Sequence, residues 1–149
     1  FNLQIMKHAK KIGFCKMATL RNLKRDGSIT NTFNIDFFKT ILFIDNKIEQ
    51  FLGDINISCT DSRRYSLLSR NVIIYLLDLM KSGNKQEKKQ VFDKVVNNAN
   101  VQKALAVNME RPYFNNRYIG IMCVILHDLL AKKRYKTARA LMFVINLMR

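Results

Sequence analysis

From residue 34 onward, apolar side chains recur every three or four positions, which is the spacing of one face of an α-helix. Such a face is buried against neighbouring helices in a bundle. We therefore expect residues 34–149 to form a C-terminal helical bundle of about five or six helices. The longest apolar stripes are Phe37, Ile41, Ile44, Ile48 and Phe51; Tyr65, Leu68, Val72, Tyr75, Leu76 and Leu79; Tyr118, Ile121, Met122, Ile125, Leu126, Leu129 and Leu130; and Tyr135, Ala138, Leu141, Met142 and Ile145.

Two of these stripes also predict which single positions are buried. Leu76 and Ile125 each lie inside a long stripe, so we expect both side chains in the core. Gly53 follows the first stripe and is expected to end its helix, because glycine is favoured just past a helix C-terminus. Arg111–Pro112 should interrupt the chain before the third stripe, since the residue before a proline is disfavoured in a helix.

Residues 1–33 have a different pattern. Phe1, Ile5, Met6 and Ala9 have helical spacing, whereas apolar and polar residues alternate weakly over residues 12–24. We expect a short N-terminal helix and then a small β element of one or two strands. The predicted fold class is therefore mainly α, with one unit over residues 1–33 and a helical domain over residues 34–149.

Charge is concentrated at the two ends of the chain. The sequence holds 26 Lys and Arg against 11 Asp and Glu, a formal net charge of +15. Neither residues 1–25 nor residues 132–149 contain an acidic side chain, although both segments are rich in Lys and Arg. This pattern suits a polyanionic partner, which could be nucleic acid, an anionic membrane surface or a phosphate-bearing substrate. A merely solvated basic surface is the alternative.

The sequence offers few groups for catalysis or metal binding. Cys15, Cys59 and Cys123 are widely spaced, and His8 is far from His127, so neither a zinc site nor a disulfide framework is expected. Buried thiols in a reducing compartment are the simplest interpretation. His127 and Asp128 are adjacent on a predicted helix, so their side chains should diverge. The longest uncharged apolar runs are far shorter than the ~20 residues that span a bilayer.

One short motif resembles a known family. Ala9-Lys10-Lys11-Ile12 is followed by Arg25-Asp26-Gly27-Ser28-Ile29-Thr30, just before the helical pattern begins. This order resembles the end of the catalytic domain in bacterial family 2 glycosyltransferases of the GT-A fold. There, a helix ends in a similar Ala-Lys-Lys-Ile segment, and an Arg-x-Gly-Ser-Ile-Thr turn leads into a C-terminal helical region. The resemblance covers mainly residues 1–34, so residues 1–33 would be the tail end of a GT-A catalytic domain.

The resemblance implies an enzyme that transfers a sugar from a nucleotide-sugar donor to a cell-surface polysaccharide or lipid-linked glycan acceptor. Arg25, Ser28 and Thr30 would then contact substrate, through a fixed cation and two hydroxyl groups. The catalytic acidic residue and the aspartates that hold a divalent cation, Mg²⁺ or Mn²⁺, would lie upstream of Phe1. We expect no catalytic residue, metal ligand or cofactor within these 149 residues, and the chain alone should be inactive.

The basic C-terminal segment has its own expected partner. Lys132, Lys133, Arg134, Lys136 and Arg139 precede a dense apolar block at residues 141–145, which suits a helix that contacts an anionic membrane or a lipid-linked acceptor. The protein would then be cytoplasmic and peripheral on the inner face of the plasma membrane. The alternative is a basic helical module that binds nucleic acid or has a regulatory role. It would use the same charge, although aromatic residues are not interleaved with the basic runs.

Overall fold

The computed structural model describes residues 34–55, 61–81, 85–112 and 116–149. The helix expected near the N-terminus, the small β element of residues 12–24 and the motif residues Arg25, Ser28 and Thr30 lie outside the described residues. Within the described ranges the chain is helical and contains no strand. The prediction that the chain is mainly helical is confirmed for this part of the molecule.

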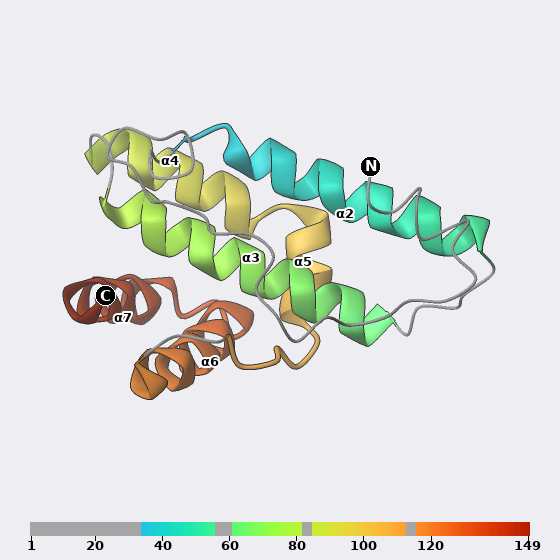
Figure 1. The fold of residues 1–149 in the computed structure, drawn as a ribbon. Coiled ribbons are helices and arrows are strands. Elements are labelled where there is room, and N and C mark those ends of the chain that lie inside the picture. The colour runs from blue at the N-terminus through green and yellow to red at the C-terminus, as the bar shows by residue number, and fades with distance from the viewer. Residues whose placement is uncertain (1–33, 56–60, 82–84, 113–115) are drawn as a thin grey trace, which may run out of the picture.

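Each long apolar stripe of the sequence forms a helix (Figure 1). Two further helices, α4 and α5, connect the second stripe to the third. The helices are α2 (Phe37–Asp54), α3 (Asp61–Lys81), α4 (Lys85–Val96), α5 (Ala99–Leu105), α6 (Arg117–Ala131) and α7 (Tyr135–Met148).

Helix α3 is the centre of the bundle. It packs against α2, α4, α5, α6 and α7, so its side chains meet neighbours in nearly every direction (Figure 1). Val72, Ile73, Leu76 and Leu77 are completely buried in α3. The expectation that Leu76 belongs to the core is therefore confirmed. Helix α3 also contributes Leu68, Tyr75 and Leu79 to the core, and most other core residues come from the inner faces of the surrounding helices.

Helix α2 lies along α3 (Figure 1). Buried apolar side chains and an ion pair between Asp45 and Arg64 hold the two helices together. Phe38 and Ile41 are buried against the core. The helix was expected to end at Gly53, but it ends one residue later. The helix runs through Asp54, and the Ile55 N–H donates to the Phe51 carbonyl oxygen. The backbone at Ile55 has a negative φ, so the turn here does not need glycine.

Residues 108–112 are not helical, as expected at Arg111–Pro112, and the end of this segment passes close to α6. A Cβ atom placed on Gly120 would lie 2.8 Å from the Pro112 carbonyl oxygen and 3.1 Å from the Arg111 side chain. Only a residue without a side chain fits that approach without a backbone shift. Asn116 then begins α6, since its side-chain oxygen accepts a hydrogen bond from the Tyr118 N–H at 3.0 Å.

A short turn joins α6 to α7 and makes them an antiparallel hairpin, which lies on one side of α3 (Figure 1). Lys133 has a φ of 56°, the left-handed conformation that commonly follows a helix C-terminus. The Lys133 N–H donates to the Leu130 carbonyl at 3.0 Å, and the Arg134 N–H donates to the Leu129 carbonyl at 2.8 Å. These bonds satisfy two end carbonyls of α6 and let α7 start at Tyr135.

Predictions about the core were wrong on two helices. On α2, Phe37 and Ile44 belong to the predicted apolar stripe but are 51% and 45% exposed. On α6, the error concerns Ile125. Ile125 is 49% exposed and Ile121 is 38% exposed, although both lie on the apolar stripe of α6. The buried face of α6 instead consists of Ile119, Gly120, Cys123, Leu126, His127 and Leu130. Helix α6 carries apolar residues around most of its circumference, and α3, α5 and α7 cover only part of it. Spacing alone could not identify the covered side.

Candidate functional site

The five basic residues predicted for membrane or acceptor contact gather at the α6–α7 turn. Lys132, Lys133 and Arg134 form the turn, and Lys136 and Arg139 lie in the first two turns of α7. The structure therefore brings these five residues together, as their closeness in sequence requires. Arg25, Ser28 and Thr30, the predicted substrate contacts, lie in the part of the chain that the structure does not describe.

Two of the five basic residues already have partners within the protein. Arg139 forms an ion pair with Asp93 of α4 at 2.9 Å, and its guanidinium lies 4.4 Å from the centroid of the Phe92 ring. Its side chain is 33% exposed, so Arg139 mainly fastens α7 to α4. Lys132 pairs with Asp128 at 3.0 Å on the surface of α6, a contact of little energetic weight.

The other three basic side chains are available to an external partner. Lys133, Arg134 and Lys136 are exposed and form no ion pair with any residue that the structure describes. We call these three residues the hairpin cations. Asp128, which is paired with Lys132, is the one acidic residue of the sequence between residues 116 and 149. The hairpin therefore carries a positive potential that no nearby acidic residue of its own neutralises.

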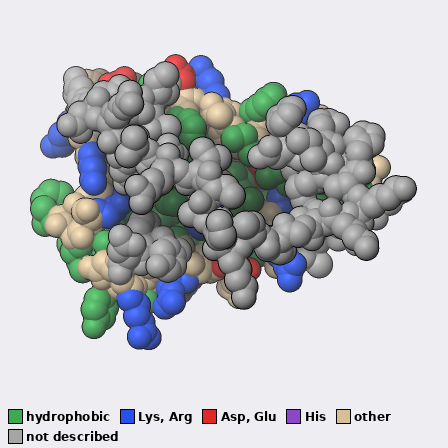
Figure 2. Space-filling model, viewed as in Figure 1, with side chains coloured by type: hydrophobic (Ala, Val, Ile, Leu, Met, Phe, Trp, Pro, Cys, Tyr) green, Lys and Arg blue, Asp and Glu red, His purple; other side chains and the backbone are tan. Residues whose placement is uncertain are grey.

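Large apolar side chains are exposed on the same two helices. Of ten large hydrophobic side chains that are exposed among the described residues, seven lie on α6 and α7. Figure 2 shows green and blue side chains together at the lower left of the molecule, where Figure 1 places these two helices. We call the seven residues the hairpin face: Tyr118, Ile121, Ile125, Phe143, Val144, Leu147 and Met148.

The hairpin face lies on the sides of α6 and α7 that are turned away from the core. Helix α7 directs Ala138, Met142 and Ile145 into the core, and α6 directs Cys123, Leu126 and Leu130 there. On α6 the exposed residues follow one another at three- or four-residue spacing, and on α7 they form two pairs, Phe143–Val144 and Leu147–Met148, about one helical turn apart. Clustered apolar residues on a surface, unlike scattered ones, mark an interaction site.

The C-terminal end of the hairpin is firmly fixed to the centre of the bundle. The Asn146 side-chain amide donates to the Leu77 carbonyl oxygen at 2.8 Å. Arg149 forms an ion pair of 2.8 Å with Asp78 of α3. Together with the Arg139 contact to α4, these bonds hold α7 at both ends. The hairpin face is thus presented by a rigid platform.

The reactive side chains of the hairpin lie inside the core. Cys123 is fully buried, and burial raises the pKa of its thiol to about 11, so the thiol is protonated at neutral pH. His127 is also buried, and desolvation lowers the pKa of its imidazole, which favours the neutral ring. Asp128 points to solvent and pairs with Lys132, so the two adjacent residues diverge as expected. These positions suit packing more than catalysis.

A buried ion pair between α2 and α3 was not anticipated from the sequence. The Arg64 guanidinium donates to both carboxylate oxygens of Asp45, at 2.9 and 2.7 Å, and also pairs with Glu49 at 2.8 Å. Arg64 and Asp45 are both buried, and the hydrogen bond to Asp45 raises the pKa of the guanidinium above its usual value. The feature of the sequence that could have revealed this ion pair is Asp45, a charged residue that follows Ile41 by four positions on the inner face of α2.

The described residues contain neither a candidate metal site nor a candidate membrane-spanning helix. No group of three or more His, Cys, Asp or Glu side chains is placed there to hold a metal ion. The Mg²⁺ or Mn²⁺ ligands that the family resemblance implies upstream of Phe1 stay a prediction. None of the described helices is both long enough and apolar enough to cross a bilayer.

Comparisons with known proteins add no assignment. No protein-family model matches the chain, and neither a curated protein nor a solved structure is similar to it at a significant level.

Proposed function

We propose that this chain is the C-terminal portion of a family 2 glycosyltransferase that transfers a sugar from a nucleotide sugar to a cell-surface polysaccharide or lipid-linked glycan. The observation that carries the proposal is the Arg25–Thr30 motif, which is followed after a few residues by the helical domain. In this proposal residues 1–33 end the catalytic domain, and α2 to α7 form an accessory domain. The core positions of Cys123 and His127 suit such a non-catalytic role.

The proposed enzyme works at the cytoplasmic face of the plasma membrane, where lipid-linked acceptors are found. Its nucleotide-sugar donor binds to the catalytic domain, and Arg25, Ser28 and Thr30 contact substrate at the edge of that site. A divalent cation, held by residues upstream of Phe1, would neutralise the donor pyrophosphate when bound. The exposed cations and apolar residues of α6 and α7 support a location next to anionic lipid.

Sugar transfer by the full-length protein that contains this chain tests the proposal. We expect transfer from one of a panel of nucleotide sugars in the presence of Mg²⁺ or Mn²⁺, and none from the purified 149-residue chain. Arg25→Gln should reduce transfer by about 10-fold or more, since a cation that positions a phosphate is lost. Lys24→Gln removes the same charge one residue away and serves as the control.

Two results would reject the proposal. Transfer by the 149-residue chain alone would show that the catalytic groups lie within it. Failure of the full-length protein to transfer or hydrolyse any nucleotide sugar would remove the glycosyltransferase assignment.

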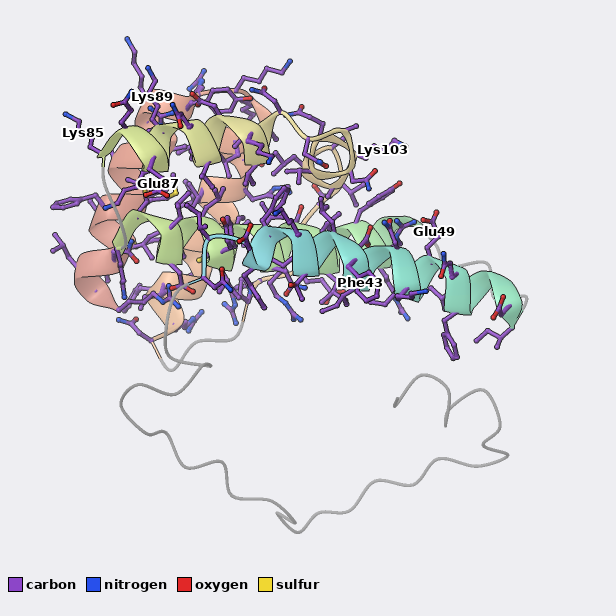
Figure 3. The ribbon with its side chains drawn as sticks, turned by 90° about the horizontal axis from the view of Figure 1, so that it is seen from above. Phe43, Glu49, Lys85, Glu87, Lys89 and Lys103 are labelled. Carbon is purple, nitrogen blue, oxygen red and sulfur yellow. The ribbon has the colours of Figure 1, made fainter. Side chains whose placement is uncertain are left out.

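A second candidate function rests on a different basic surface. Lys85 and Lys89 project from α4, and Lys103 projects from α5, on the side away from α2 (Figure 3). We call these three residues the α4–α5 lysines. A row of exposed lysines is the feature that a phosphate backbone would contact. In this case duplex DNA or RNA should bind with a steep salt dependence, and Gln substitutions of the α4–α5 lysines should weaken binding.

A further inference from the structure

We propose that the hairpin face and the hairpin cations form one docking surface for an anionic lipid bilayer. The inference deepens the proposed function and rests on its membrane location. It goes further by naming the side chains that enter the bilayer interface, and by including α6, which the basic C-terminal segment does not reveal.

The first argument is the arrangement of apolar and charged groups. Leu147 is 73% exposed and Phe143 is 63% exposed on α7, and Ile125 is about half exposed on the neighbouring α6. The hairpin cations lie on the same two-helix unit, at and just after the turn that joins α6 to α7. A surface helix with apolar residues on one side and cations beside them lies in the plane of the headgroups. Here two adjacent helices provide that surface.

The second argument is that charge favours lipid over a second copy of this chain. A symmetric dimer through the hairpin face would place the same patch of both copies together. The hairpin of the second copy would offer Lys133, Arg134 and Lys136 no acidic partner except Asp128, which is already paired. The negative surface of an anionic bilayer attracts all three cations.

The third argument is that the exposed apolar groups favour lipid over nucleic acid. Single-stranded nucleic acids bind through aromatic side chains on which bases stack. Five of the seven residues of the hairpin face are aliphatic, namely Ile121, Ile125, Val144, Leu147 and Met148. Such side chains gain little from phosphates or bases, but they gain from transfer into the acyl region.

The fourth argument comes from the backbone of the turn. Lys133 has a left-handed conformation, which costs free energy for any residue with a Cβ atom and is usually occupied by glycine. Its side chain forms no ion pair with another described residue, and the backbone hydrogen bond from the Lys133 N–H to the Leu130 carbonyl would form equally with glycine at this position. A lysine in a position that favours glycine places one more cation at the tip of the hairpin.

The depth of docking is limited by the fold. The inner sides of α6 and α7 are committed to the core, and Asn146, Arg149 and Arg139 fasten α7 to α3 and α4. The hairpin can therefore enter only the headgroup region and the outer acyl region with its outer side chains. The bundle stays on the aqueous side, and the catalytic domain is held near a lipid-linked acceptor.

Vesicle co-sedimentation of the 149-residue chain tests the surface. We expect the chain to bind phosphatidylcholine vesicles that contain phosphatidylglycerol and to bind pure phosphatidylcholine weakly. Each basic residue near an anionic surface contributes roughly a fivefold increase in binding. The triple variant K133Q/R134Q/K136Q should therefore bind on the order of 100-fold more weakly. The control K85Q/K89Q/K103Q removes three charges from the α4–α5 lysines and should lose much less binding.

A tryptophan probe makes the test specific for position. The chain contains no tryptophan, so Tyr118→Trp would report from the hairpin face alone. Its emission should shift to the blue when anionic vesicles are added, because the indole ring enters a less polar region. Phe43→Trp is the matched control, since Phe43 is 60% exposed on α2 and lies outside the hairpin (Figure 3). Its emission should stay unchanged.

The apolar contribution is tested separately. Ile125→Ser and Leu147→Ser together should weaken vesicle binding by about 10-fold or more, and the loss should persist at high salt, which screens charges only. Circular dichroism and thermal melting would show that each variant keeps the fold, as expected for exposed positions.

Several results would overturn the inference. They are unchanged vesicle binding by the hairpin variants, an equal loss in the α4–α5 control, a blue shift of Phe43→Trp instead of Tyr118→Trp, and a dimer that forms through the hairpin face without vesicle binding. Steep salt-dependent DNA binding that requires the hairpin cations would also reject a lipid partner. Failure of the proposed enzyme function would give a different result. In that case the chain would still bind vesicles, but the full-length protein would transfer no sugar.

Discussion

Helices α3 and α6 are both rich in apolar residues, but they occupy different places in the bundle. Helix α3 is surrounded by five other helices, and its apolar residues Val72, Ile73, Leu76 and Leu77 are fully buried. Helix α6 is covered on one side, and Tyr118, Ile121 and Ile125 face outward. The apolar content of α3 is explained by packing. The apolar content of α6 exceeds what the core needs, and the proposed docking surface would account for the excess.

The largest expected effect is a difference in stability between the same kind of substitution in α3 and in α6. Leu76→Asp places an unpaired carboxylate in the centre of α3 and should destabilise the protein by more than about 4 kcal/mol, enough to unfold it. Ile125→Asp changes an exposed position of α6, and its effect should stay within about 0.5 kcal/mol. Thermal or urea denaturation of both variants measures the difference. Equal losses of stability would mean that the outer side of α6 is covered after all.

A smaller effect is expected where α2 joins α3. Asp45→Ala leaves the buried Arg64 guanidinium with the exposed Glu49 as its remaining ion-pair partner among the described residues, and should cost about 3 kcal/mol of unfolding free energy. Glu49→Ala removes the exposed partner and should cost less than about 1 kcal/mol. Urea denaturation of the two variants compares the contacts. Should the two losses be similar, the buried pair would contribute no more than a surface ion pair.

The smallest effect concerns the hairpin turn and has the opposite sign. Lys133→Gly relieves the left-handed backbone strain and should stabilise the protein by about 1 kcal/mol. Lys132→Gly is the control, because Lys132 has a φ of −79° and gains nothing from glycine there. Thermal denaturation gives both values. If Lys133→Gly is more stable but binds anionic vesicles less well, the lysine lowers stability and favours membrane binding. If the variant is less stable, the left-handed backbone at Lys133 is not strained.

The helices and much of the core could be predicted from sequence because their signal is local. Three- and four-residue spacing placed Leu76, Val72 and Ile145 correctly, and consecutive lysines and arginines had to lie together at the hairpin turn. Which side of an almost uniformly apolar helix is covered depends on distant segments. For that reason Ile125 was assigned to the core and α6 was not recognised as part of a surface.

The ion pair between Asp45 and Arg64 shows a second limit of sequence reasoning. Asp45 interrupts the inner face of α2, where a single carboxylate looks like the polar edge of an amphipathic helix. Its partner is nineteen residues away on α3, and only the packing of the two helices brings the groups within 2.9 Å. The assignment to a glycosyltransferase has a different status, because Arg25, Ser28 and Thr30 lie outside the described residues, and it stays a prediction.

Cys123 gives the hairpin an internal reporter of its own motion. Its sulfur is enclosed between helices and its pKa is about 11, so thiolate is scarce at neutral pH and alkylating reagents have no direct access. Modification of Cys123 therefore requires α6 to separate transiently from the rest of the bundle. The rate at which the peptide containing Cys123 becomes labelled measures how often that separation occurs. A surface that holds the α6–α7 hairpin in place should slow the labelling.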